Sequence, residues 1–366
     1  MKNSWFLMVI ALACSAFSCS KSKDASSLSP FLAMMRTGSN VSGNESSAAA
    51  PPHLAPPWEE NQNDDHPAQT TRTPLCVGPS VSYRILFSGW APDLEHYAIY
   101  SMESDGTTIQ ALSDELHFDT TPNLTNGRLL FARFGPENSP LKWNSNIYSA
   151  LANGSELTQL TNRDIRLGSP SVLGNGRIVY HELSANSISS IHSMASDGTS
   201  PTPIIMGTLQ TGAFQPRVSP DGNRIAYIHY GIEENKSTNE VYIMQSTGAN
   251  KTRLTFSTEN VLNFAPVWSL DGERILFTRS TGDSIESVIY SMNVNGSNLR
   301  KMTDGFVDSG PAFTPDGKII FASSRDPDHI QGNHGSIFRM DSDGSNVCRL
   351  TDQTLPGVGE LFVVPE

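Results

Sequence analysis

The 366-residue sequence is poor in positive charge and, after its first residues, in long hydrophobic runs. It has 25 lysines and arginines against 37 aspartates and glutamates, so the formal net charge is −12. Nucleic acids and anionic membrane surfaces both favour clustered basic residues, and no basic run follows Lys23, so neither is expected as the main partner. No later apolar run approaches the roughly 20 residues that a transmembrane helix needs.

Cysteine is also scarce, and two of the four cysteines lie in an N-terminal segment that has the form of an export signal. A short cationic start is followed by an apolar run from Trp5 to Ala13 and by small residues. This order is typical of a secretory signal peptide, which we predict over residues 1–18. The polar, serine-rich stretch that follows offers a buried helix nothing to pack against.

Both N-terminal cysteines lie where bacterial lipoprotein signals place the residue that is lipidated, and the region resembles a lipobox. Cys14 has the better small residue before it, but it would leave a very short signal. We favour Cys19, because cleavage there removes Cys14 and leaves one pair, Cys76 and Cys348, for an oxidising compartment. Ser20 follows Cys19, which by resemblance to enteric sorting favours the outer membrane. Whether the body faces the periplasm or the exterior stays open.

A spacer is predicted over residues 19–75, which are rich in serine, alanine, proline, asparagine and aspartate. Such a composition cannot bury enough apolar surface to offset the entropy lost on ordering. The acidic stretch that ends at His66 lacks a strand or helix to fix a metal geometry, so we interpret it as solvated linker. The spacer would hold a folded head away from a membrane.

Residues 76–366 consist mainly of a repeated unit of 45 to 50 residues, the spacing between the prolines that begin its copies. Each copy has a proline-led triplet, a glycine turn, an apolar strand with an aromatic residue, a second apolar strand and a closing Arg-Leu-Thr or related triplet. The prolines are Pro122, Pro170, Pro216, Pro266 and Pro311. An earlier copy without this triplet begins near Arg84, which makes six copies.

Four-strand units at a fixed period of this size predict an all-β protein, a six-bladed β-propeller of four-stranded antiparallel blades. The pattern of Pro216-Arg-Val-Ser-Pro-Asp-Gly222, Val241-Tyr-Ile-Met244 and Arg253-Leu-Thr255 resembles the WD40-like repeats of TolB-type propellers. Related repeats also occur in the propeller domains of prolyl oligopeptidase relatives. The resemblance covers about residues 79–352 and implies a fold, because such propellers host unrelated functions.

The recurring Asp-Gly pairs are interpreted as tight turns, since glycine supplies the positive φ that such turns need. Asp341-Ser-Asp343-Gly-Ser-Asn346 is similar to a calcium loop but lacks the distal glutamate, so no metal site is predicted. Trp268 and Phe313 fall at repeated positions and are assigned to the blade core.

The two ends of the repeat region are expected to meet. The first copy lacks a good first strand, and Glu360-Leu-Phe-Val-Val364 is apolar, so we predict that it completes that blade and removes an unpaired edge. Cys348 replaces a polar residue of the sister repeats that is expected to be exposed, and Cys76 precedes the first blade. A Cys76–Cys348 disulfide between the neighbouring first and sixth blades is one of two alternatives, free thiols being the other.

We predict that the binding site lies on the rim that carries the loops between the second and third strands. The sequences of those loops differ from blade to blade, whereas the Asp-Gly turns of the other rim are nearly the same in each blade. The predicted binding residues are Trp90, Arg133, Trp143, Glu182, His229, Arg279 and Arg325. The two tryptophans would be aromatic anchors. The mouth of the central channel would be surrounded by Arg133, Glu182, His229 and Arg279. Solvated loop residues are the alternative interpretation.

Catalysis is not predicted: the sequence has no Gly-x-Ser-x-Gly elbow and no catalytic domain after the propeller. No catalytic residue, metal or cofactor is assigned. We expect a lipid-anchored monomer that binds an envelope protein or peptide. The alternative is a polysaccharide lyase that uses rim histidines and a metal, but strand alternation would point His181 and His229 to opposite faces.

Overall fold

The computed structural model describes residues 73–79, 81–91, 96–114, 117–135, 143–233, 236–257, 261–281, 286–304, 306–325, 336–351 and 358–365. Within these ranges the chain forms strands β1 to β24 and no helix, so no described helix could cross a membrane. The predicted signal peptide, Cys19 and nearly all of the predicted spacer lie outside the described residues. Those predictions therefore stay predictions.

The strands form antiparallel groups of four. In each group the first three strands are longer, and the fourth usually has only two residues. The first group is β24 (Val358–Pro365), β1 (Tyr83–Ala91), β2 (His96–Glu103) and β3 (Gln110–Ala111). The next two are β4 (Asp119–Thr125), β5 (Arg128–Phe134), β6 (Ser145–Leu151), β7 (Thr158–Gln159), and β8 (Arg166–Val172), β9 (Ile178–Leu183), β10 (Ser189–Met194), β11 (Thr202–Ile205).

The remaining groups follow the same order along the chain. They are β12 (Thr211–Val218), β13 (Arg224–Glu233), β14 (Lys236–Gln245), β15 (Thr252–Arg253); β16 (Val261–Trp268), β17 (Arg274–Thr281), β18 (Ser287–Asn293), β19 (Arg300–Lys301); and β20 (Asp308–Phe313), β21 (Ile319–Ser323), β22 (Ser336–Met340), β23 (Cys348–Arg349). A parallel pair of Ser145 and Arg166 joins the β4–β7 and β8–β11 groups into one eight-stranded sheet. A parallel pair of Asn239 and Leu262 joins the β12–β15 and β16–β19 groups into a second one.

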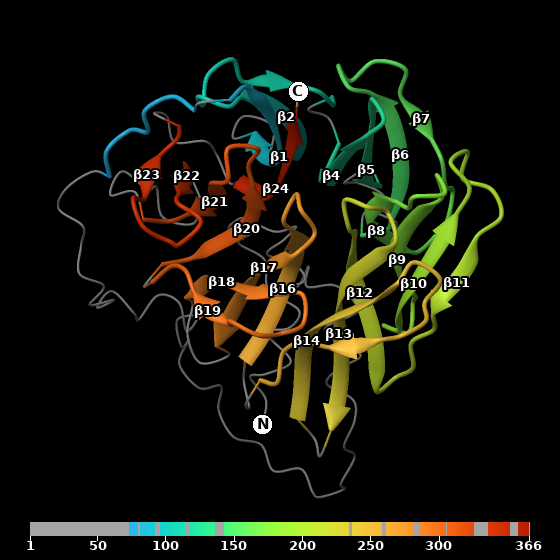
Figure 1. Ribbon diagram of the computed structural model, residues 1–366. Coiled ribbons are helices and arrows are strands. Elements are labelled where there is room, and N and C mark those ends of the chain that lie inside the picture. Colours follow the sequence, from blue (N-terminus) through green and yellow to red (C-terminus); the bar gives the residue numbers. More distant parts are fainter. Residues whose placement is uncertain are drawn as a thin grey trace, which may run out of the picture. The chain divides into compact units, whose positions relative to one another are not determined.

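The first strands of the groups lie next to one another in a circle (Figure 1). Strand β4 contacts β24 and β8, β12 contacts β8 and β16, and β20 contacts β16 and β24. Hydrogen-bonded pairing does not run all the way round, so packing completes the circle. The core that joins the last group to the first contains Ile85 and Phe87 with Ile320 and Ile337.

A β-bulge interrupts each first strand. In β4 the pairing with β5 shifts between Thr120 and Asn123, and the two residues skipped are Thr121, at a φ of 57°, and Pro122. The same shift skips the proline in β8, β12, β16 and β20. Proline has no backbone N–H to give to a ladder, so a bulge is where a strand tolerates it. In β24 the skipped residues are Gly359 and Glu360, which places a carboxylate where its sisters have proline.

The two remaining repeat signatures have local structural roles. The hydroxyl after each closing leucine or methionine accepts a backbone N–H of the third strand, as Thr255 does from Val241 at 2.9 Å. The carboxylate of Asp343 accepts the N–H of Ser345 at 2.9 Å, and Gly344 has a φ of 86°. This is the turn chemistry that the sequence predicts. Trp268 and Phe313 are buried, as predicted.

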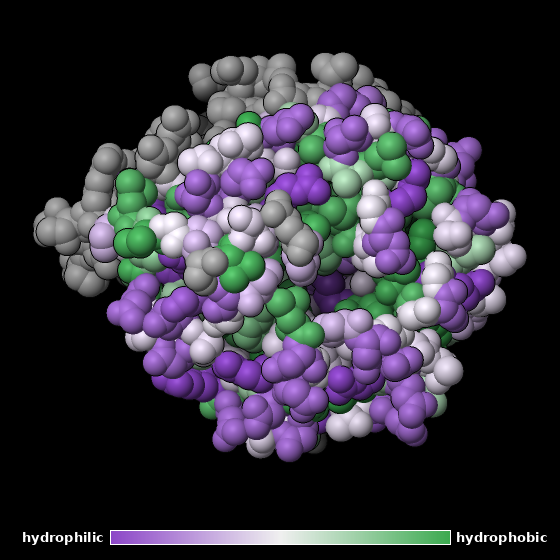
Figure 2. Space-filling model, turned by 45° about the horizontal axis from the view of Figure 1, so that its top comes forward, coloured by the Kyte–Doolittle hydropathy of each residue, from purple (hydrophilic) through white to green (hydrophobic). Residues whose placement is uncertain are grey.

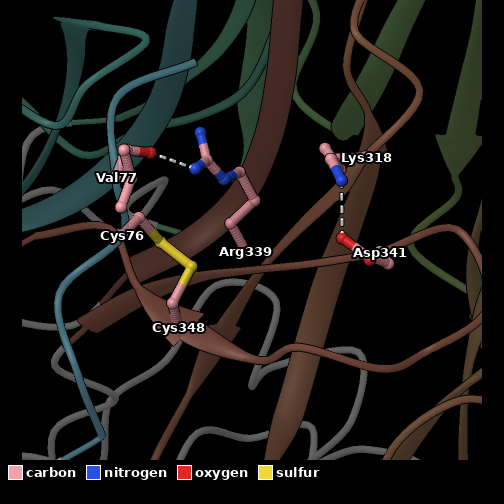
Figure 3. The surroundings of a disulfide bond; sticks show 6 residues. All are labelled: Cys76, Val77, Lys318, Arg339, Asp341 and Cys348. Atoms are coloured by element: carbon pink, nitrogen blue, oxygen red, sulfur yellow. Dashed lines mark hydrogen bonds and ion pairs between the residues drawn. A yellow bond between two sulfur atoms is a disulfide. The ribbon is translucent and has the colours of Figure 1, made fainter. Parts of the chain in front are cut away.

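Both ends of the described chain are fixed at the seam between the last and first groups. Strand β24 pairs antiparallel with β1, which confirms the predicted closure, and Figure 1 shows it beside β1. On the outer edge, the N–H of Cys76 donates to the carbonyl of Arg349 at 2.9 Å. Cys76 and Cys348 form a disulfide, and Arg339 donates to the carbonyl of Val77 (Figure 3).

Candidate functional site in the central channel

Arg133, predicted at the rim, is buried and fully engaged inside its own group. Its guanidinium donates to both carboxylate oxygens of Asp119, at 2.8 and 2.7 Å, and lies 2.8 Å from a carboxylate oxygen of Asp114. It also lies over the rings of Phe131 and Tyr148, with its central carbon 5.5 and 5.3 Å from the ring centroids. Arg133 therefore covers the end of the aromatic pair of its group.

Arg279 and Arg325 have the same arrangement in their own groups. Arg279 donates to the side-chain oxygen of Asn263 at 2.9 Å and lies over Tyr290 at 4.4 Å. Arg325 donates to Asp308 at 2.8 Å and lies over Phe321 at 4.9 Å. A sequence signal for these partners exists: Asp119, Asn263 and Asp308 each stand three residues before the proline of the first strand.

The other predicted rim residues are not brought together. Trp143 precedes β6 and is 41% exposed, whereas the side chain of Trp90 lies outside the described residues. Glu182 on β9 lies 3.5 Å from Arg163, and the ring of His229 on β13 lies 4.9 Å from that of Tyr242. Whether any of these seven residues binds a partner stays a prediction.

A cavity that sequence reasoning did not single out lies between the first strands. Its lining includes Thr121, Arg166, Gly168, His181, Gln215 and Glu360. Thr121 and Gln215 are bulge residues that bind the next first strand, through the N–H of Ser169 at 3.2 Å and of Ala265 at 2.8 Å. We call this space, of about 30 Å³, the inner cavity. The space-filling view shows a hollow bordered by hydrophobic and hydrophilic residues (Figure 2).

His181 fits into the inner cavity because the residue opposite it is glycine. Gly168 and His181 are paired in the register of β8 and β9, and a Cβ on Gly168 would lie 2.7 Å from Cε1 of His181. The corresponding pairs in the five other groups are Thr120 with Ala132, Phe214 with Ile228, Phe264 with Thr278, Ser309 with Ala322 and Val358 with Gly89. The imidazole is therefore a feature of this one group, and nothing in the repeat requires it.

Arg217 of β12 and Glu360 of β24 form a buried ion pair. In the circle of first strands β12 and β24 lie opposite each other, so this pair crosses the channel. The two residues are 143 positions apart in the sequence. A larger cavity, of about 430 Å³, is lined by Ser171, Val218 and Phe362 among others. In sequence, Arg217 stands between Gln215, which lines the inner cavity, and Val218, which lines the larger one.

Arg166 and Glu360 bring charged side chains to the lining of the inner cavity. Burial lowers the pKa of Arg166 to about 10, so the guanidinium stays charged near neutral pH. Burial, together with the charges of Arg166 and Arg217, lowers the pKa of His181 to about 3, so its imidazole is neutral there. Among the described residues, Nδ1 of His181 and Nη1 of Arg217 have no hydrogen-bond partner. The described residues contain no group of three or more His, Cys, Asp or Glu side chains placed to hold a metal ion.

Comparison with known proteins identifies the repeat. Residues 175–355 match the family model described as the TolB beta propeller domain. A 112-residue stretch is 29% identical to the uncharacterized peptidase YuxL of Bacillus subtilis (strain 168) and covers 30% of this chain and 16% of YuxL. The match thus spans about a sixth of the length of that curated relative.

Solved structures show the same fold. TolB from Acinetobacter baumannii is similar with a TM-score of 0.60 and 19% identity, over 78% of this chain and 67% of that chain. A putative TolB from Agrobacterium tumefaciens gives 0.54 and 20%, over 78% and 98%. An oligogalacturonate lyase in complex with manganese gives 0.50 and 14%, over 73% of each chain. At these identities the similarity concerns the fold alone.

Proposed function

Because this chain contains a TolB-type β-propeller domain, we propose that it is an exported binding protein that holds a protein or peptide and catalyses no reaction. Its groups of four strands are the six blades of a ring closed by β24. The signal peptide over residues 1–18 directs export and is removed, and the lipid on Cys19 anchors the protein to the outer membrane, facing the periplasm or the exterior. It acts as a monomer, and the membrane contacts it only through lipid.

The observation that carries the binding role is the exposed indole of Trp143. Its side chain is 41% exposed just before β6, on the rim whose loops join second and third strands. Large aromatic residues contribute most to protein interfaces when they are accessible and rigidly placed. Here Ser145, two residues later, is fixed to the next group through its hydroxyl and the carbonyl of Leu167 at 2.6 Å.

Crosslinking and pull-down from the native envelope test this proposal. Trp143→Ala is expected to lose partners that wild-type protein captures. Leu157→Ala is the matched control, because Leu157 is 46% exposed in the turn between β6 and β7 of the same group, on the opposite rim. Equal capture by both variants would remove Trp143 from the binding site. Mass spectrometry of the mature N-terminus tests the anchor, and an unmodified Cys19 on an intact signal would overturn it.

A carbohydrate-active propeller is the second candidate, and the arginine in the lining of the inner cavity favours it because uronic acid residues carry carboxylates that a guanidinium can bind. The lyase among the similar structures is described as a complex with manganese. The described donors here do not fit such a metal: His181 faces Gly168, whereas the ring of His229 lies against Tyr242. Release of unsaturated products from polygalacturonate would support this candidate. Unchanged polymer, with partners captured from the envelope, would support the binding protein.

A further inference from the structure

The larger cavity is formed where three neighbouring groups turn from their first strand to their second. It is lined by the ends of β4, β8 and β12, by the turns that follow them and by Phe362 of β24. Two of these turns are held together at glycines, since the N–H of Gly174 donates to the carbonyl of Gly222 at 3.1 Å. The volume of about 430 Å³ lies within the range of about 300–1,000 Å³ that small-molecule sites occupy.

The lining of the larger cavity offers no uncommitted charge. Asp221 is the one ionisable residue among those that line it. Its carboxylate accepts the hydroxyl of Ser219 at 2.5 Å and the N–H of Asn223 at 3.1 Å, and it lies 3.8 Å from the guanidinium of Arg224. A charged ligand would lose hydration here without gaining an opposite charge that is free to pair with it. The cavity therefore favours an uncharged ligand.

Uncharged polar groups line the cavity on the sides of β4 and β8. The hydroxyl of Thr125 donates to the carboxamide oxygen of Asn123 at 2.9 Å, so its own oxygen can accept from a ligand. The hydroxyl of Ser171 accepts the N–H of Val218 at 3.1 Å, so its own hydrogen can be donated. Carboxamides and hydroxyls both donate and accept. Apolar side chains complete the lining, and they include Val172, Leu173, Pro220 and Phe362.

The repeat does not require these polar groups. The residue after the proline of the first strand is Asn123 or Ser171 in two of the groups that line the cavity, but Val267 or Ala312 in two groups that do not. The turn residue before glycine is asparagine in the same two groups, Asn126 in one of them, whereas the next three groups have aspartate. Asparagine and aspartate both suit such a turn, so the fold does not select between them. Two separate positions thus differ in the same chemical direction.

We propose that the larger cavity is a binding site for a neutral mono- or disaccharide. Each hydroxyl of a sugar both donates and accepts, as do the carboxamides of Asn123 and Asn126 and the hydroxyls beside them. The C–H faces of a sugar ring can pack on Phe362 and Leu173. A purely apolar ligand would leave these polar groups without partners. An extended peptide is matched by the backbone of a strand edge, whereas turns surround much of this cavity.

Binding is tested on the full-length protein with glucose, galactose and N-acetylglucosamine, followed by NMR of the asparagine side-chain amides. We expect at least one of these neutral sugars to shift the amide resonances of Asn123 and Asn126 saturably. Glucosamine and glucuronate, which carry a positive and a negative charge, are expected to bind more weakly than that neutral sugar. Asn126→Gly should weaken the affinity by about fivefold, the loss of one neutral hydrogen bond.

A matched control variant separates loss of the carboxamide from a change in the turn. Glycine tolerates the φ of 53° at position 126, so Asn126→Gly should fold. The control is Asn298→Gly, because Asn298 is also exposed and has a φ of 54° in the turn between β18 and β19. It should leave the affinity for the sugar unchanged.

Four results would overturn the assignment. The first is the absence of a saturable shift with all the neutral sugars in the wild-type protein, which needs no variant to fold. The second is tighter binding of glucosamine or glucuronate. The third is saturation by an acetylated and amidated alanine peptide without saturation by a sugar. The fourth is equal weakening by Asn126→Gly and Asn298→Gly. The proposal does not depend on protein binding at the rim, since none of these measurements uses the Trp143 surface.

Discussion

His181 is the residue whose protonation should affect stability most directly. Its pKa is lowered from 6.5 to about 3 in the folded protein by burial and by the charges of Arg166 and Arg217. Between these two values the unfolded chain binds a proton that the folded chain does not. The stability that comes from keeping His181 neutral is therefore fully present above pH 6.5 and is lost as the pH falls toward 3.

We predict that His181→Gln reduces this loss. Thermal unfolding measured in the upper part of the window, above the range in which carboxylates titrate, should show a smaller decrease in Tm per pH unit than in the wild type. His192 also has a pKa lowered by burial, so part of the slope remains. An unchanged slope in His181→Gln would contradict the assignment.

Gly198 shows how a single residue sets the distance between neighbouring groups. Its φ is 86°, and a Cβ would lie 1.9 Å from the carbonyl oxygen of Leu160 in the preceding group. Gly176 has a φ of 81° but no atom within 4 Å of an added Cβ. The two positions thus have the same backbone requirement and differ in the close contact.

Gly198→Ala is accordingly expected to destabilise the protein more than Gly176→Ala does. The second variant should lower the free energy of unfolding by about 1–2 kcal/mol, the cost of a left-handed conformation for a residue with a Cβ. The first adds a clash with backbone that cannot move without separating the groups. Chemical denaturation of both variants measures the difference, and equal losses would show that the turn does not pack on Leu160.

At the scale of elements, the sequence predicted the strands and turns well because each repeat specifies them locally. The glycine turns and the aromatic second strands recur at fixed spacing, and even the pairing of β24 with β1 followed from one missing and one surplus strand. The inner cavity could not be predicted in this way. Arg217 and Glu360 are 143 residues apart, and neither recurs, so no spacing relates them.

For the predicted rim residues, the sequence indicated the positions but not the side chains that they contact. Arg133 and Arg279 were predicted at the rim because each stands two residues after the aromatic of its second strand, and Arg325 because it begins a variable loop. Their partners come from the first strand and sit at its start, as Asp119 does for Arg133 and Asp308 for Arg325. Counting along one strand cannot show which charges a neighbouring strand supplies, although the recurring acid or amide three residues before proline was visible.

Removal of β24 should destabilise the whole domain. Val358, Leu361 and Val363 of this strand are buried in the core that joins the last and first groups. Full burial of such a side chain contributes about 1.5–3 kcal/mol each, and the cut also leaves β1 unpaired and Arg217 without its carboxylate. A chain that ends at Gly357 should have a much lower Tm than one that ends at Val364. Similar values would exclude closure by β24.

At the scale of the whole molecule, the Cys76–Cys348 disulfide closes a loop with a sequence separation of 272 residues. On the loop-entropy model a link of this length stabilises by about 5 to 6 kcal/mol relative to the reduced chain. We predict a corresponding decrease in Tm on reduction. The double variant Cys76→Ser, Cys348→Ser should show the lower Tm without reductant and no further response to it.

Peptide mapping of the unreduced protein provides the direct check. It should find the Cys76 and Cys348 peptides linked to each other and not to other cysteines. Free thiols at both positions, or a Tm that is insensitive to reductant, would contradict the prediction.

The same link decides how the domain responds to mechanical load. A pull on the chain before Cys76 passes through a covalent bond into β23 and from there into its sheet, so it does not first peel β1 away from β24. Once the disulfide is reduced, noncovalent contacts along that edge resist the pull, among them the hydrogen bonds of Cys76 and Pro74 with Arg349 and of Val77 with Arg339. A head fastened by its N-terminal side thus remains closed under tension in an oxidising compartment and becomes easier to unravel in a reducing one.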